Sequence, residues 1–255
     1  MADDGTPQRW AVALRGDEWD LERFSEHLRG PIRVTKGVDG WELAADVFES
    51  MDSGNDVAQA SRELVDNLRG LLVVKLGSTR SLETGAVLEL QLDGSRRQHV
   101  YAQAHVAVGT ARIHATGVVT YADGTTPAPA PPQPWGPILQ LATEDARVGM
   151  AMAFLALPPT WHRLYAALDA PRKDRRTGGK GGVVRRGADP HMLNLFTWTA
   201  NNYLAVRTEA RHADPDRKAP AAPMTLPDAA EFVRSVVDAW IEELLRGREW
   251  RYAHD

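Results

Sequence analysis

One short segment in the second half of the chain combines residue types that suit phosphate chemistry. It runs from Arg207 to His212 and also contains Glu209 and Arg211. A guanidinium matches a pair of phosphate oxygens, and an imidazole exchanges protons near neutral pH. The segment therefore indicates phosphate binding together with proton transfer.

The spacing alone is a weak signal, because arginine and histidine are both frequent in this chain. Arg186 and His191 have the same spacing but lie across the predicted start of a helix. Arg207 and His212 instead end a region of helical spacing and precede a polar loop and a long final helix. The alternative is that Arg211 and His212 lie at a helix C-terminus, where positive charge is favourable.

This context resembles the HEPN superfamily, whose members are small helical bundles and whose ribonucleases carry an arginine followed closely by a histidine. The resemblance covers residues 138–245. Two segments, Phe196–Asn202 and Pro223–Leu226, also resemble an uncharacterised bacterial family with a HEPN-like C-terminal domain.

The resemblance implies a bundle that dimerises and cleaves RNA without a metal ion. Arg207 would bind the scissile phosphate, and His212 would assist proton transfer as the ribose 2′-hydroxyl attacks. Arg211 and Glu209 would orient this pair.

A second cluster of positive charge lies in the glycine-rich segment 172–187. The basic residues expected to attract RNA phosphates are Arg175, Arg176, Lys180, Arg185 and Arg186. A P-loop is excluded, because Gly181 follows Lys180 and a helix is expected before the glycines. The composition predicts a mobile loop, and the alternative role is a solvated connection between helices.

Few residues suit metal or cofactor chemistry. The chain has no cysteine, which excludes thiolate metal sites, disulfides and a cysteine nucleophile. His99, His105 and His114 lie on or near predicted strands, but no acidic residue is placed to complete a ligand set. We therefore expect neither a metal ion nor a cofactor.

The first half shows strand-like and helix-like spacing in turn. Strands are predicted at Trp10–Leu14, Ile32–Lys36, Trp41–Phe48, Val87–Leu92 and Val100–Val119, and helices at Asp17–Leu28 and from the cap Asn55 onward. Residues 37–40 read as a hairpin turn. Gly70 either ends or weakens the second helix, and Leu71–Leu76 either continues it or forms a strand. The pattern predicts an α+β domain over residues 1–124, with one sheet and two helices.

Prolines separate this half from the next. Residues 125–137 hold six prolines, which predicts a stiff, extended linker. Beyond it, residues 138–255 have helical spacing almost throughout, with caps at Thr160 and Asp189 and a break at Pro171. We expect an all-α bundle.

The composition limits the cellular locations and the functions that we expect for this protein. The 255-residue chain has a net charge of −4, no secretory signal and no apolar run long enough for a membrane, so we expect a cytoplasmic protein. One hypothesis is a HEPN-like effector that binds or cleaves RNA, with a homodimer as the expected assembly. The alternative is a non-catalytic interaction or assembly module. Its expected contacts with a protein partner are Phe196, Trp198 and the basic segment.

Overall fold

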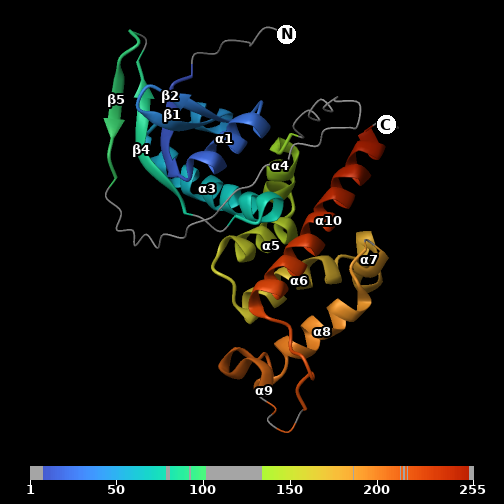
Figure 1. Cartoon of the computed structure of the whole chain (residues 1–255). Helices are drawn as coiled ribbons and strands as arrows, with labels where there is room; N and C mark the ends of the chain where they lie inside the picture. Colours follow the sequence, from blue (N-terminus) through green and yellow to red (C-terminus); the bar gives the residue numbers. More distant parts are fainter. Residues whose placement is uncertain are drawn as a thin grey trace, which may run out of the picture. The chain divides into compact units, whose positions relative to one another are not determined.

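Two compact units make up the chain, and each is described by itself. One comprises Met1–Gln59 and Arg80–Gly136, and the other comprises Ala60–Thr79 and Pro137–Asp255. The structure, a computed structural model, describes residues 8–78, 81–91, 93–101, 134–185, 187–212, 214, 216 and 218–252. The predicted α+β class is confirmed by a sheet in the first unit and helices in the second (Figure 1).

The first unit is built on an antiparallel sheet with the strand order β2-β3-β1-β4-β5. Its strands are β1 (Trp10–Gly16), β2 (Ile32–Gly37), β3 (Gly40–Ala45), β4 (Leu82–Leu90) and β5 (Arg96–His99). Trp10, Val12 and Leu14 alternate along β1 and are all buried, as the period of a strand requires. The predicted hairpin is confirmed, because Gly37 pairs with Gly40, whose φ of +129° suits glycine.

Helices α1 (Glu18–His27) and α2 (Asp46–Glu49) also belong to this unit. Leu21 and Phe24 of α1 are buried in the core. The prediction of a strand through Phe48 is wrong after Ala45. The chain instead makes the single helical turn α2, which buries the Phe48 side chain completely.

Helix α3 (Gly54–Leu76) continues through Gly70, so Leu71–Leu76 is helical and not a strand. A Cβ at Gly70 would lie 2.7 Å from the Cβ of Met152 on α5. Glycine is therefore present where two helices approach closely, and it does not end the helix. The predicted cap Asn55 is wrong: Ser53 Oγ accepts from the backbone N–H of Asp56.

The end of the proline-rich segment packs on α1. The backbone N–H of Trp135 donates a hydrogen bond of 2.9 Å to the backbone carbonyl of His27. The side-chain rings of the two residues stack with their centres 4.2 Å apart. Helix α4 (Gly136–Glu144) already begins at Gly136, so the last two positions of the predicted linker are helical. The remaining linker positions up to residue 133, and the predicted strand from residue 102 onward, lie outside the described residues.

The second unit is helical, as predicted for its chain segment. Besides α4 and the later part of α3, it contains α5 (Ala146–Ala156), α6 (Trp161–Lys173), α7 (Gly179–Arg185), α8 (Pro190–Ala200), α9 (Tyr203–Val206), α10 (Leu226–Tyr252) and the 3-10 turns η1 (Arg175–Thr177) and η2 (Arg207–Glu209). Helix α6 contacts α5, α7, α8 and α10 and is therefore central to this unit (Figure 1). The predicted caps Thr160 and Asp189 are confirmed, since each side chain accepts a backbone N–H.

The prediction of a mobile loop over residues 172–187 is wrong. Helix α6 passes through Pro171 and ends at Lys173, and η1 and α7 follow. Buried residues attach the segment to the bundle, among them Asp174, which is 1% exposed, Thr177 and the fully buried Val183. The segment is polar in composition, but these residues give it a fixed place in the second unit.

Candidate functional site

The segment Arg207–His212 follows α9 and is attached to two helices. The backbone N–H of Arg211 donates 3.0 Å to the carbonyl of Ala200, the last residue of α8. Glu209 Oε2 accepts the backbone N–H of Trp161, the first residue of α6, at 3.0 Å. These contacts place the segment on the bundle, although it contains no α-helical turn of its own.

Arg207 has an unusual backbone. Its φ of 55° and ψ of −126° make it the one non-glycine residue with positive φ in the described part of the chain. Its side chain is exposed, and the guanidinium carbon lies 6.0 Å from the centre of the Tyr203 ring. Such a conformation costs about 1–3 kcal/mol in a residue with a Cβ and is concentrated at functional sites.

Arg211 lies over the ring of Tyr165 on α6. Its guanidinium carbon is 4.3 Å from the ring centre. Arg172, seven positions further along α6, donates from Nη1 to the Tyr165 hydroxyl at 3.3 Å. Burial alone would raise the pKa of Tyr165, but contacts with Arg172 and Asn201 and the charge of Arg211 lower it by more. Two guanidinium groups, those of Arg172 and Arg211, therefore contact the Tyr165 side chain.

His212 is exposed at the end of the segment. Among the described residues, no hydrogen bond or ion pair joins it to Arg207 or to Glu209. Glu209 fixes the segment to α6 and does not orient Arg207 and His212 directly. The alternative was that the charges of Arg211 and His212 lie at a helix C-terminus. Arg211 does contact the end of α8, but through its backbone N–H and not through its charged side chain.

The basic residues of segment 172–187 have different surroundings. Arg175 is exposed on η1. Arg176 lies between two carboxylates, 2.8 Å from Asp174 and 2.7 Å from Asp145, so its charge is neutralised within the protein. Lys180 and Arg185 lie on α7, and Arg186 is outside the described residues. The structure therefore leaves Arg175, but not Arg176, free to attract an anion.

The polar residues of Phe196–Asn202 hold the loop before α10. Thr199 Oγ1 accepts the N–H of Met224, and the side chains of Trp198 and Asn202 both donate to the Lys218 carbonyl. Phe196 is fully buried against Trp161, so the prediction that it contacts a partner is wrong. Trp198 remains 42% exposed.

Sequence reasoning missed Tyr165 and Arg172. Their spacing of seven positions places both on one face of α6, which was a usable signal. Nothing in the sequence indicates that Arg211 would lie on the same ring, because this contact depends on the packing of α8 against α6 and on the hydrogen bond from Arg211 to Ala200.

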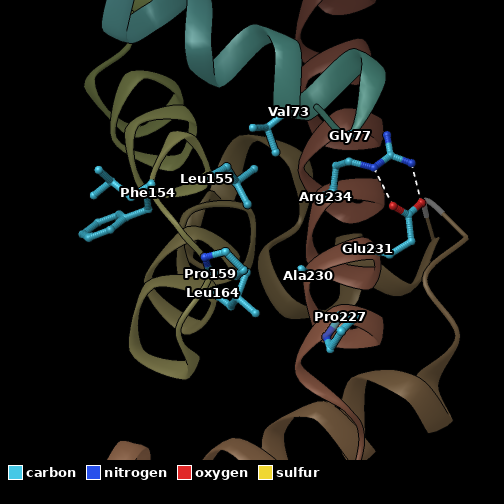
Figure 2. A pocket seen from close by; sticks show the side chains of 11 residues that line it. Val73, Gly77, Phe154, Leu155, Pro159, Leu164, Pro227, Ala230, Glu231 and Arg234 are labelled. Carbon is cyan, nitrogen blue, oxygen red and sulfur yellow. Dashed lines mark hydrogen bonds and ion pairs between the residues drawn. The ribbon is translucent and has the colours of Figure 1, made fainter. Parts of the chain in front are cut away.

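An apolar pocket lies elsewhere in the second unit, as Figure 2 shows. It is lined mainly by aliphatic side chains of α3, α5, α6 and α10, and the ion pair of Glu231 and Arg234 lies at its polar edge. Its volume of about 170 Å³ is below the roughly 300–1,000 Å³ of most small-molecule sites. The pocket suits a single apolar side chain better than a cofactor.

The described residues contain no group of three or more histidine, aspartate and glutamate side chains that could hold a metal ion. His99 on β5 pairs with Glu89 at 3.1 Å, and His105 and His114 lie outside the described residues. No helix in the described part of the chain has the length and apolar character needed to span a membrane.

Comparisons with known proteins add no relative. No protein-family model, curated protein or solved structure matches this chain. The resemblance to the HEPN superfamily therefore stays a prediction from the sequence.

Proposed function

We propose that the second unit is a HEPN-like RNA-binding module that cleaves RNA without a metal ion. Arg207 holds the scissile phosphate, and His212 transfers a proton as the 2′-hydroxyl attacks. The observation that carries this proposal is the backbone of Arg207, with its φ of 55°. A strained residue that is also exposed and cationic is better explained by ligand binding than by packing.

The charges around Arg207 support the proposal. In the part of the chain that the structure describes, neither Arg207 nor Arg211 has a carboxylate partner, whereas Arg176 has two. An unpaired exposed guanidinium keeps its donors available for phosphate oxygens. The segment thus combines two available arginines with the exposed imidazole of His212.

The test is cleavage of a labelled single-stranded RNA in excess EDTA. We expect wild-type protein to cut it, and Arg207→Ala and His212→Ala each to slow cutting by about 100-fold or more. Arg147→Ala is the matched control, since Arg147 is an exposed arginine on α5, away from this segment. Wild-type protein that cuts no RNA, or variants that cut at the wild-type rate, would refute the proposal.

Binding of a protein partner is the second candidate function. Met150 on α5 is 44% exposed, and Leu157, which directly follows α5, is 46% exposed and lines the apolar pocket. Apolar side chains exposed next to an apolar pocket are typical of an interaction surface. A second copy of the chain is one such partner, so light scattering should detect a smaller species for Leu157→Glu than for wild-type protein.

A further inference from the structure

We propose that Arg211, supported by the ring of Tyr165, binds an unpaired base of the RNA, so that single-stranded RNA is the preferred ligand. This inference rests on the proposed function and names the class of RNA that the site accepts.

The first observation is the position of the Arg211 guanidinium. Its central carbon lies over the Tyr165 ring at 4.3 Å, a distance typical of stacking. Arg211 is nevertheless exposed, whereas Tyr165 is only 7% exposed. The guanidinium thus lies against the ring while the residue stays exposed to solvent. Exposed arginine guanidinium groups are surfaces on which unpaired bases stack.

The second observation is that the support is fixed on both sides. The Tyr165 hydroxyl accepts from Arg172, and the ring packs 6.0 Å from Phe196 in the core. The backbone of Arg211 is held by Ala200. A preorganised stacking surface loses little conformational entropy when a base binds.

The third observation is that Arg211 is close in sequence to Arg207, the arginine proposed to bind phosphate. Arg207 and Arg211 are four positions apart, in a segment anchored at both Glu209 and Arg211. The segment thus carries a second exposed arginine four positions from the one proposed to hold the phosphate. A duplex keeps its bases stacked and paired, so it offers no base face to this site.

The test is fluorescence anisotropy with a short 2′-O-methyl RNA, which cannot be cut by attack of a 2′-hydroxyl. The same oligonucleotide is measured as a single strand and as a duplex, with wild-type protein, Arg211→Lys and Arg211→Ala. Lysine keeps the positive charge but lacks the planar guanidinium group. Arg211→Lys therefore separates base stacking from attraction to phosphate.

We expect the single strand to bind more tightly than the duplex, and Arg211→Lys to weaken single-strand binding by about 5- to 150-fold. The salt dependence should not change in Arg211→Lys and should become shallower in Arg211→Ala. Binding by Arg211→Lys that matches wild type, or equal binding of the duplex, overturns the inference and leaves the proposed function standing. Wild-type protein that binds neither RNA overturns both.

Discussion

The indole Nε1 of Trp240 donates a hydrogen bond of 2.9 Å to Asp174 Oδ2 inside the second unit. Asp174 is 1% exposed, and Trp240 is fully buried. Arg176 donates to both oxygens of the same carboxylate. Burial alone would raise the pKa of Asp174, but the hydrogen bonds from Arg176 and Trp240 lower it by more. The aspartate is thus ionised and links η1 to α10.

Replacing Asp174 with asparagine should destabilise the second unit by about 3 kcal/mol at pH 7, because Arg176 and Trp240 lose their charged acceptor. Urea unfolding followed by tryptophan fluorescence measures this. The control is Asp66→Asn, since Asp66 is exposed and pairs with Arg69 on the same helix, and such pairs contribute up to about 1 kcal/mol. Equal effects of the two substitutions would contradict the assigned role of Asp174.

The same carboxylate makes stability depend on pH. Because its pKa is lowered on folding, its contribution is complete above the unfolded value of about 3.9 and is lost as the pH falls through the lower folded value. The stability difference between wild-type protein and Asp174→Asn should therefore shrink below about pH 4. A difference that stays constant down to pH 2 would show that folding does not lower the pKa of Asp174.

Lys75 on α3 should stabilise the second unit through α10. Its ammonium lies 2.8 Å from Asp238 and also bonds Glu242, and its side chain is 14% exposed. Burial lowers its pKa, but the two carboxylates raise it by more. Lys75→Gln should cost about 1–3 kcal/mol in urea unfolding, whereas Arg69→Gln, which removes a more exposed pair with Asp66, should cost under about 1 kcal/mol. Because the pKa of Lys75 is raised on folding, its contribution is complete below the unfolded value of 10.5 and is lost as the pH rises through the higher folded value.

Gly70 should be intolerant of a side chain. A Cβ there would lie 2.8 Å from the carbonyl oxygen of Met152, so α3 and α5 would have to separate. Gly70→Ala should lower the unfolding free energy by about 1–3 kcal/mol despite the better helix propensity of alanine. The matched control is Gly181→Ala on α7, where a Cβ meets nothing within 4 Å and should stabilise by roughly 0.5–1 kcal/mol. A stabilising Gly70→Ala would disprove the close approach.

Local signals were enough to predict most elements. The hairpin at Gly37–Gly40 follows from two glycines between strand-like runs, and the caps Thr160 and Asp189 follow from their side chains. Each of these signals acts within a few residues. The α+β class depended only on such signals and was therefore predictable.

Features that depend on distant residues were not predictable. Helix α6 continues past Pro171 into an ordered turn because Asp174 meets Trp240, 66 positions further along the chain. The stacking of Arg211 on Tyr165 likewise joins the segment after α9 to α6, and no sequence periodicity predicts such a contact. The backbone strain at Arg207 has no sequence signal, since positive φ is predicted for glycine or asparagine and not for arginine.

Glycine at position 207 should separate stability from function. Glycine adopts a φ of 55° without the penalty that arginine carries, so Arg207→Gly should raise the unfolding free energy by about 1 kcal/mol. The same variant lacks the guanidinium proposed to hold phosphate, so it should cut RNA no better than Arg207→Ala. Thermal unfolding and the EDTA cleavage assay, run on both variants, give the two readouts.

Arg207→Ala is the control for this pair, because alanine removes the side chain but keeps the Cβ and hence the strained backbone. It should lose activity without gaining stability. A more stable Arg207→Gly with wild-type RNA cleavage would mean that the strain serves only the turn after α9. An Arg207→Ala variant that is clearly less stable than wild-type protein would mean that the Arg207 side chain helps to hold this turn through its 6.0 Å contact with the Tyr203 ring. A glycine variant no more stable than the alanine variant would mean that the backbone at position 207 is not strained.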